Sequence, residues 1–455
     1  MGYILARAIT RKRRESWRMN KDGLIYLVWS DLVGMARTRG VPIADFDRRL
    51  ESGLGWANAG QAMTPFEHLA DNPWGPVDEV RQIPDPETRF TIPGNDMNPV
   101  LHAVICDSRA APGKNWNACV RQFCREAVAE LKSETGLDLI AAFELEFLIE
   151  SEDFHPEAPF SFRAAAVNHN FLTGLEHMLT SAGFTPETVE PEYGRGQYEI
   201  SCQPRTALKA ADAALVSCEI AREAARRFGL RASFTPKPTP NHVGNGCHIH
   251  LSLADKQGHN VSSDRSGPLG LGKTAAQFCA GVLKHMEAVL AFTAPSPISY
   301  HRLGPHHWST GYRCIGLQNR EAALRVMPGI SHDPEKAARG FNIEMRAADC
   351  TASPYLALGV LTRAGLEGIR GEFELPSPAK IDPASMTAEE RAEAGITALP
   401  VSLDAALKAL KADEVARTWF TDDLYNTFLS IKSWEADYAR STAPDQTFAR
   451  YRHAY

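Results

Sequence analysis

The stretch Leu139–Ile149 constrains the fold of this chain most strongly, because two carboxylates, Glu144 and Glu146, interrupt an otherwise apolar run. Side chains along a β-strand alternate between its faces, so the two glutamates should emerge side by side on one face. Two like charges on a half-buried strand repel each other and are costly to desolvate. The rest of the chain must therefore supply one of three remedies: a shared proton, paired cations or a divalent metal ion.

Composition narrows the class of protein. A chain of 455 residues can hold a large core and two or more domains. Its net charge of −6 gives no basic field that would attract nucleic acid. No apolar stretch approaches the ~20 residues of a membrane span, and no secretory signal is evident. The nine cysteines include no Cys-x-x-Cys pair, which indicates reduced thiols and predicts a cytoplasmic protein.

The order of predicted strands and helices along the chain indicates an α+β fold with one small and one large domain. An N-terminal arm at 1–20 carries the basic run Arg11–Arg14. A small β-rich domain at 21–113 follows, with strands predicted at 24–29, 35–41 and 100–106 and a loop at 51–75. Helical and strand patterns then mix through 114–455. There we expect helices at 117–133, 207–228, 273–292 and 354–371, two more between 403 and 440, and strands at 139–149, 230–235, 322–326 and 341–347.

Four further segments place polar residues in predicted strands or turns: Glu192-Tyr-Gly-Arg-Gly-Gln-Tyr-Glu199, Gly244-Asn-Gly-Cys-His248-Ile-His250-Leu-Ser252, Asn319-Arg320-Glu-Ala-Ala-Leu-Arg325 and Phe341-Asn-Ile-Glu344-Met-Arg346. Taken alone, each of these segments is explained most simply by an ordinary structural ion pair or by a core histidine whose hydrogen bonds are satisfied. Their recurrence argues otherwise, because burying so many charges without a shared centre would be very costly.

The residue types indicate the chemistry of such a centre. Carboxylates with one imidazole suit Mg²⁺ or Mn²⁺ better than zinc. Divalent cations beside several arginines are typical of phosphoryl transfer. The chain has neither a Walker A sequence nor protein-kinase signatures. A two-metal hydrolase is an alternative, which the number of arginines disfavours.

These segments resemble, in order, the motifs of the glutamine synthetase family. Three more fit the same series: Arg302-Leu303, Ser353-Pro-Tyr-Leu356 and Ser30-Asp-Leu-Val-Gly-Met-Ala-Arg37. The resemblance covers nearly the whole chain and implies an N-terminal β-grasp domain followed by a large catalytic α+β domain. It implies a homo-oligomer of two stacked hexameric rings, a dodecamer, with active sites between subunits. It further implies that ATP phosphorylates the γ-carboxylate of glutamate before an amine nitrogen displaces the phosphate.

The resemblance also implies residue roles by position. A first metal ion would be held by Glu146, Glu192 and Glu199, and a second by Glu144, His248 and Glu344. The remaining positions concern substrates: Arg302 and Arg346 as clamps on carboxylate and phosphate, Gly244 as a backbone contact to glutamate, Arg320 and Arg325 on the phosphates, and His250 and Ser252 beside the nucleotide and phosphate.

Two departures concern the nitrogen donor. Ammonia-using members carry a flap glutamate where this chain has Trp308, and their Asp-Gly-Ser-Ser segment is replaced by Glu51-Ser-Gly-Leu-Gly-Trp56. Indole and glycine give a larger, more apolar pocket than an ammonium site. We therefore expect an organic primary amine as acceptor and a γ-glutamylamide as product. Trp308 would line the amine pocket and Trp56 could join it, with ordinary packing as the alternative for Trp56.

Two other functions remain open at this stage. One is an ammonia-using glutamine synthetase with an unusual flap. The other is a catalytically inactive relative, against which the six filled metal positions argue. Two smaller departures, Val243 in place of an asparagine and Asn342 in place of a basic residue, bear on details of the substrate and nucleotide contacts.

Overall fold

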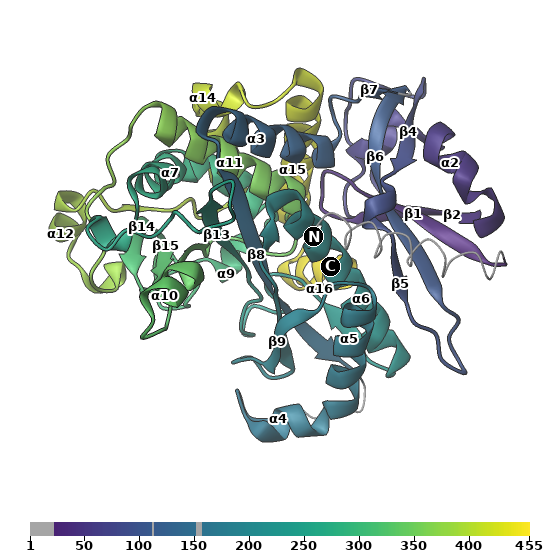
Figure 1. Ribbon diagram of the computed structural model, residues 1–455, viewed down its shortest axis with the longest axis horizontal. Helices are drawn as coiled ribbons and strands as arrows, with labels where there is room; N and C mark the ends of the chain where they lie inside the picture. The colour runs from purple at the N-terminus through teal and green to yellow at the C-terminus, as the bar shows by residue number, and fades with distance from the viewer. Residues whose placement is uncertain (1–21, 112, 152–156) are drawn as a thin grey trace.

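The computed structural model describes residues 22–111, 113–151 and 157–455 (Figure 1). The N-terminal arm with its basic run therefore lies outside the described residues. Within them the chain forms two β-sheets that share no strand, and helices surround the larger sheet. The expected mixture of helices and strands is confirmed.

The N-terminal sheet has seven strands among the described residues, in the order β2-β1-β6-β4-β3 with β5 and β7 beside β6. Its strands are β1 (Leu24–Ser30), β2 (Ala36–Pro42), β3 (Leu54–Ala57), β4 (Glu79–Pro84), β5 (Phe90–Ile92), β6 (Leu101–Ala111) and β7 (Lys114–Asn115), with α2 (Phe46–Ser52) between β2 and β3. The predicted return of the chain after β1 is confirmed, since β1 and β2 pair antiparallel. The loop expected at 51–75 is wrong in part, because β3 lies within it and pairs with β4.

The large sheet has ten strands in the described chain, in the order β17-β14-β15-β16-β13-β8-β10-β9, with β11 and β12 also on β8. The strands are β8 (Asp138–Glu150), β9 (Pro186–Pro191), β10 (Gln197–Cys202), β11 (Arg205–Thr206), β12 (Arg231–Ser233), β13 (Cys247–Ala254), β14 (Tyr312–Leu317), β15 (Ala322–Met327), β16 (Asn342–Met345) and β17 (Thr397–Ala398).

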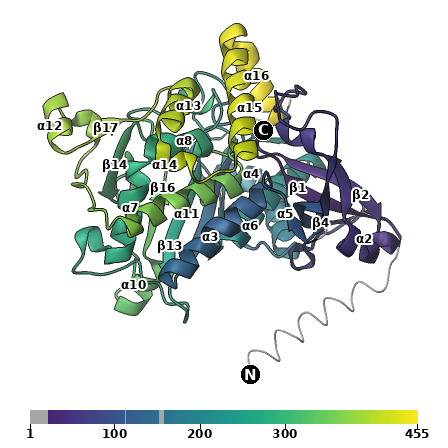
Figure 2. The same ribbon diagram turned by 90° about the horizontal axis from the view of Figure 1, so that it is seen from above.

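Three long helices cover one face of this sheet, which we call the back face. They are α3 (Val120–Thr135), α6 (Ala207–Arg227) and α11 (Pro354–Arg370), which lie side by side in Figure 2. Phe143, Leu145 and Phe147 of β8 pack into the core beneath them. The intervening residues Glu144 and Glu146 consequently point to the opposite, front face.

Register aligns the charged residues of neighbouring strands on the front face. β13 pairs antiparallel with β8 so that His248 lies opposite Glu144. β10 places Glu199 opposite Glu146, and β16 places Glu344 opposite His250. A strand-by-strand slip of one residue would turn these side chains into the core.

A buried ion cluster joins the two sheets. Arg121 of α3 donates to Asp107 of β6 at 2.8 Å and to Asp85 at 3.0 Å, both in the N-terminal part of the chain. It also donates to Asp212 of α6 at 2.8 Å. Tyr355 of α11 donates to the same Asp212 at 2.7 Å. The cluster therefore fixes the N-terminal sheet against the helices of the back face.

Helix boundaries depart from the predictions in two places. The helix expected at 273–292 is two helices, α7 (Lys273–Lys284) and α8 (Met286–Thr293), separated at His285. His285 pairs there with Asp413 at 2.6 Å. The two helices expected between 403 and 440 are three, α13 (Leu403–Ala412), α14 (Glu414–Arg417) and α15 (Asp422–Ser441), because Asp413 caps α14 and Thr421 caps α15.

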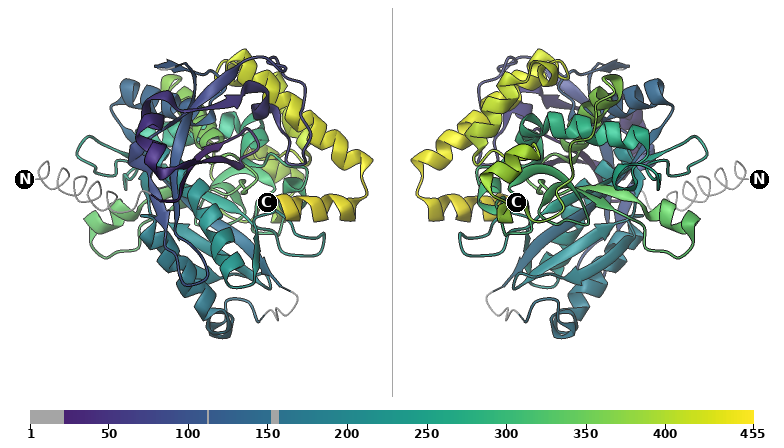
Figure 3. Two further views of the ribbon diagram at one scale, coloured as in Figure 1. Left: turned by 90° about the vertical axis from the view of Figure 1, so that its right-hand side faces the viewer. Right: turned by 90° about the vertical axis from the view of Figure 1, so that its left-hand side faces the viewer.

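A further helix, α16 (Pro444–Ala454), was not predicted. The C-terminal helices, yellow in Figure 3, run close to the purple N-terminal sheet. Phe66 packs there against Phe448 and Tyr451, and Tyr455 donates to the carbonyl of Val33 at 2.7 Å. Among the described residues, no helix is both long and apolar enough to span a membrane.

Candidate active site

Two overlapping groups of side chains on the front face could each hold a metal ion. Their ligand atoms lie within 4.8 Å of one another, and His248 belongs to both: Glu144, His248 and Glu344 in one, Glu146, Glu199 and His248 in the other. The Nδ1 of His248 lies 3.2 Å from a Glu144 oxygen, 3.7 Å from Glu146 and 3.6 Å from Glu344. Five of the six ligands predicted from sequence thus come together.

Glu192, the sixth predicted ligand, lies in the turn between β9 and β10 and outside both groups. Its carboxylate accepts a hydrogen bond from the backbone of Tyr193 at 2.9 Å. Burial, and then the charge of Glu146, raise the pKa of Glu192 to about 7. The glycine turn thus brings Glu192 within electrostatic reach of the site.

The charge balance differs along the front face. Burial, followed by repulsion from Glu144 and Glu146, raises the pKa of Glu199 to about 10. Burial also opposes ionisation of Glu344, but His248 and Arg346 outweigh it and lower the pKa of Glu344. The protein therefore neutralises the Glu344 end of the site with cations, whereas at the other end burial and neighbouring carboxylates favour the protonated form of Glu199.

This donor set fits a hard divalent cation. It is rich in carboxylate oxygens with one shared imidazole, the combination that suits Mg²⁺ or Mn²⁺. A cation near Glu146 and Glu199 would offset the repulsion that raises the pKa of Glu199. Both paired cations and a metal ion are thus remedies that the front face can use, at opposite ends.

His250 and Ser252 share the front face of β13 with His248. The Nε2 of His250 lies 3.0 Å from a carboxylate oxygen of Glu144, and its Nδ1 lies 2.8 Å from the side-chain amide oxygen (Oδ1) of Asn342. Burial alone would lower the pKa of His250, but the hydrogen bond to Glu144 and its charge raise the value to about 9. Ser252 lies further along the strand, opposite Ile140, and belongs to neither ligand group.

Arginines surround the Glu344 end. Arg325 of β15 donates to Glu344 at 3.0 Å, and Arg346 pairs with the other oxygen of the same carboxylate. Arg346 also donates to the carbonyl of Trp308 at 2.6 Å and to that of Arg320 at 2.9 Å. The Arg320 side chain itself is exposed on the turn between β14 and β15.

Arg302 lies at the end of α9 (Ser299–Arg302), buried with 4% of its surface exposed. Its Nη2 donates to the carbonyl of Arg346 at 3.2 Å, and its Nη1 has no hydrogen-bond partner within the part of the chain that the structure describes. A Cβ at Gly244 would lie 2.5 Å from the Arg302 side chain, so only glycine fits there. A buried guanidinium with a free donor is suited to binding a carboxylate.

Two positioning residues were missed by sequence reasoning. Gln197, buried on β10, donates to Glu146 and to the carbonyl of Gly244, both at 2.8 Å. The backbone of Gly246 donates to Glu146 at 2.9 Å, and a Cβ there would lie 2.8 Å from the Nε2 of His248. The spacing of two between Gln197 and Glu199 places both on one strand face, a signal that could have identified Gln197.

Trp308 lies at the outer side of the site. Its backbone adopts a positive φ of 52°, its N–H donates to Glu321 at 2.9 Å, and 58% of its surface is exposed. Its ring centroid lies 6.3 Å from that of Tyr193, which lies 6.2 Å from that of Phe160. The three rings form an exposed aromatic row beside Glu192.

Trp56 does not join this row within the chain. Its ring packs edge-on against Trp29 at 4.9 Å in the core of the N-terminal sheet. Packing, the alternative weighed for Trp56, accounts for its position.

Comparison with known proteins defines the class first. The family model of the glutamine synthetase catalytic domain matches residues 117–451, and that of the glutamine synthetase N-terminal domain matches residues 10–116. Proteins of this kind are ATP-dependent ligases with the α+β fold described above. The chain belongs to the glutamine synthetase family.

Individual relatives cover almost the whole chain. The γ-glutamylpolyamine synthetase GlnA3 of Streptomyces coelicolor is 32% identical over 95% of this chain and 93% of its own length. The glutamine synthetase of Pyrococcus woesei is 30% identical over 92% of this chain and 91% of its own length. Because these identities are nearly equal, overall similarity does not distinguish the nitrogen donor.

Solved structures agree with the fold. A crystal structure of a glutamine synthase homolog superposes with a TM-score of 0.88 at 36% identity, covering 96% of this chain and 99% of that one. A complex of GmaS with ADP superposes with a TM-score of 0.79 at 25% identity, covering 94% and 96%.

Proposed function

We propose that this chain joins the γ-carboxylate of glutamate to an organic primary amine at the expense of ATP, giving a γ-glutamylamide. The observation that carries the proposal is the convergence of carboxylates, one imidazole and arginines on the front face, beside an exposed indole. The proposed metal ligands are the six predicted from sequence: Glu146, Glu192 and Glu199 for one ion, and Glu144, His248 and Glu344 for the other. Mg²⁺ or Mn²⁺ bound there would neutralise phosphate charge.

The balanced reaction has two steps. An oxygen of the glutamate γ-carboxylate takes the terminal phosphoryl group of ATP, which releases ADP and leaves an acyl phosphate. The amine nitrogen then attacks the acyl carbon, the C–O bond to phosphate breaks, and phosphate and a proton leave. Charge stabilisation is the main requirement of phosphoryl transfer.

The arginines can meet that requirement. Guanidinium groups bind planar carboxylates and phosphates through two parallel hydrogen bonds. We assign Arg302 to the substrate carboxylate, because its side chain lies against Gly244 and its Nη1 has no hydrogen-bond partner among the described residues. We assign Arg346 and Arg325 to the transferred phosphate. Arg320 on the neighbouring exposed turn, with His250 and Ser252 on β13, would contact the phosphates and nucleotide.

The aromatic row supports an organic amine as acceptor. Trp308 and Tyr193 present exposed rings rather than carboxylates beside Glu192. Aromatic rings bind the carbon chain of an amine by burial of apolar surface and attract its ammonium form by cation–π contact. The name of the Streptomyces coelicolor relative, a γ-glutamylpolyamine synthetase, is consistent with this choice.

An amine panel tests the proposal. Phosphate release that depends on ATP, glutamate and Mn²⁺ or Mg²⁺ should be measured with ammonium and with alkyl-, aryl- and polyamines, and the amide identified by mass spectrometry. We expect kcat/KM for at least one organic amine to exceed that for ammonium. A higher value for ammonium than for every amine would favour the ammonia-using alternative. Absence of both metal binding and ATP turnover would identify an inactive relative.

Inhibition by analogues of the phosphorylated intermediate tests the glutamate pocket separately. Methionine sulfoximine-like and phosphinothricin-like compounds should inhibit strongly if Arg302 and Arg346 clamp the carboxylate and phosphate. Full activity at high inhibitor concentration would remove those two assignments. That result would not bear on the identity of the amine, which the amine panel tests.

A further inference from the structure

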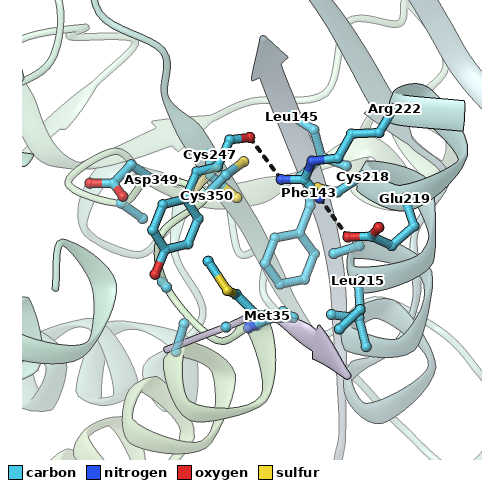
Figure 4. A pocket seen from close by; sticks show the side chains of 18 of the residues that line it. Met35, Phe143, Leu145, Leu215, Cys218, Glu219, Arg222, Cys247, Asp349 and Cys350 are labelled. Carbon is cyan, nitrogen blue, oxygen red and sulfur yellow. Dashed lines mark hydrogen bonds and ion pairs between the residues drawn. The ribbon is translucent and has the colours of Figure 1, made fainter. Parts of the chain in front are cut away.

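A cavity of about 220 Å³ lies directly behind the proposed metal site, on the back face of the same strands (Figure 4). β8 and β13 contribute Phe143, Leu145, Cys247 and Ile249 to its wall. Because strand residues alternate in direction, each of these is a chain neighbour of a front-face residue. The cavity and the proposed metal site therefore share two strands as a common wall.

The remaining walls come from both parts of the chain. Met35 belongs to the turn between β1 and β2, Leu215 and Cys218 to α6, and Cys350 to the segment after β16. Tyr455 closes another side, and its hydroxyl donates to the carbonyl of Val33 in the turn between β1 and β2. The cavity therefore lies where the N-terminal sheet meets the catalytic sheet.

Sulfur is concentrated in this wall. Three of the nine cysteines border the cavity, and the thiol of Cys350 contacts those of Cys218 and Cys247. The contact with Cys350 and burial raise the pKa of Cys218 well above its usual range. Neutral buried thiols act as small, polarizable apolar groups, and sulfur packs favourably against aromatic rings.

Three of the four charged side chains of the wall, those of Arg37, Glu219 and Arg222, have ion-pair partners. Arg37 donates to Asp31 at 2.7 Å, and Arg222 donates to Glu219 and to the carbonyl of Tyr455. The Oδ1 of Asp349 accepts from the backbone of Thr351 at 3.0 Å, whereas its Oδ2 has no hydrogen-bond partner among the described residues. The Asp349 carboxylate points away from the thiols in Figure 4. A ligand that brought its own charge would have to disrupt the existing ion pairs, turn the Asp349 carboxylate toward the thiols, or remain unpaired.

We propose that this cavity binds a small neutral molecule with an aromatic or branched-alkyl body, and that its occupancy alters metal affinity on the front face. An apolar cavity of ~150 Å³ already holds benzene, so a substituted arene fits the larger space here. Strands transmit the effect, because displacing Phe143 or Cys247 moves the backbone that carries Glu144 and His248. The proposal goes beyond the ligase activity and does not depend on which amine is used.

Binding can be measured on the full chain without glutamate or amine. Fluorobenzene, 4-fluorobenzoate and 4-fluorobenzylamine have one shape and three charges, and ¹⁹F NMR titration follows each. We expect saturable binding of about one fluorobenzene per chain, with at least tenfold weaker binding of both charged analogues. Equal or tighter binding of a charged analogue, or no saturable binding of fluorobenzene, would overturn the proposal.

Two substitutions locate the site from different walls. Ala214→Leu on α6 and Cys350→Leu both reduce the cavity, and each folded variant should bind fluorobenzene at least tenfold more weakly. Trp308→Ala is the control, because that ring lies on the aromatic row, and it should bind fluorobenzene like the parent. Loss of binding in the control, or unchanged binding in both filled variants, would place the ligand elsewhere and refute the assignment.

Mn²⁺ affinity tests the coupling. Titration by electron paramagnetic resonance, with and without saturating fluorobenzene, should show at least a twofold change in the Kd for Mn²⁺. An unchanged Kd with the cavity filled would refute the coupling. A protein that binds no Mn²⁺ at all would instead count against the proposed ligase.

Discussion

The two faces of β8, β13 and β16 are built from alternating residues of the same strands, yet they are stabilised in opposite ways. Behind the strands, Phe143, Ile249 and Ile343 are buried in a continuous apolar core. On the front, Glu144, His248 and Glu344 are packed together at ion-pair distances. Apolar burial stabilises the fold by itself, whereas like charges brought together are unfavourable unless something compensates them. Repulsion between carboxylates is thus confined to the front face of the sheet, where a bound cation would relieve it.

Compensation is uneven along the front face. Arg325 and Arg346 neutralise Glu344, while Glu199 and Glu192 have raised pKa values and no ion pair among the described residues. The charge of Glu344 is therefore compensated by the protein itself, whereas Glu192 and Glu199 lie where an added cation would compensate them. The predictions below test this contrast, starting with the largest effect.

Glu344→Gln should have the largest effect, because it removes a charge that two arginines and His248 contact. We expect the amine-dependent turnover to fall at least about 100-fold, the scale for losing one preorganised electrostatic group. Loss of one partner of a buried ion pair also destabilises a fold by about 3–5 kcal/mol. Steady-state kinetics and chemical denaturation check both expectations.

Glu134→Gln is the matched control for that substitution. Glu134 pairs with Arg370 on the surface, and exposed ion pairs contribute about 0–1 kcal/mol. Turnover of this variant should match the parent. If Glu344→Gln behaved like Glu134→Gln, the front face would have no special role.

Metal-free protein should lose stability as the pH rises from about 5 to 8. The raised pKa of Glu192, about 7, means that the folded state holds a proton which the unfolded carboxyl, with its pKa near 4.5, has released. Stability from such a group is present below pH 4.5 and is lost as pH rises through the folded pKa. His250, with its pKa raised to about 9, contributes in the same direction above pH 6.5.

Added Mn²⁺ should reverse that trend, because a metal ion binds the deprotonated carboxylates and displaces their protons. The increase in Tm caused by Mn²⁺ should therefore grow between pH 5 and pH 8, which differential scanning fluorimetry can follow. A Mn²⁺ effect that stayed constant or shrank over this range would show that these carboxylates do not hold the ion.

The sequence predicted the front face well, because strand alternation makes a polar residue in an apolar run conspicuous. Glu144, Glu146, His248 and Glu344 were all found in this way. Gln197 was missed because an uncharged amide in a strand gives no electrostatic signal, although its partners show its role. The order of the motifs, rather than any one of them, indicated the fold.

Some features depend on three-dimensional packing and could not be predicted from the sequence pattern. Trp56 and Trp308 have the same residue type, but one packs on Trp29 and the other is exposed beside Tyr193. At the break between α7 and α8, His285 is hydrogen-bonded to Asp413, which is distant in sequence. The back-face cavity is lined by segments that are far apart in the sequence, so no local sequence pattern could predict it.

Trp308→Glu should change the choice of nitrogen donor. A carboxylate in the aromatic row would favour a small hydrated cation and remove apolar contact area. We expect the ratio of kcat/KM for the best organic amine to that for ammonium to fall about tenfold, equivalent to ~1.4 kcal/mol. Trp308→Phe is the control and should keep most of the ratio. An unchanged ratio in Trp308→Glu would remove Trp308 from the acceptor pocket.

Ile343→Val should have the smallest effect, although it is the chain neighbour of Glu344. Ile343 is buried on the back face of β16, between Leu251 and Val326 on the adjacent strands. Removing one methylene from such a site costs about 0.5–1.5 kcal/mol, because the lost burial is only partly recovered by repacking. We expect a lower denaturation midpoint with an unchanged slope and turnover within twofold of the parent. Since Glu344→Gln and Ile343→Val alter adjacent residues, opposite outcomes would show that the direction of a side chain, not its place on the strand, determines its role. A loss of turnover in Ile343→Val comparable to that in Glu344→Gln would mean that the two faces cannot be separated, and the contrast between them would fail.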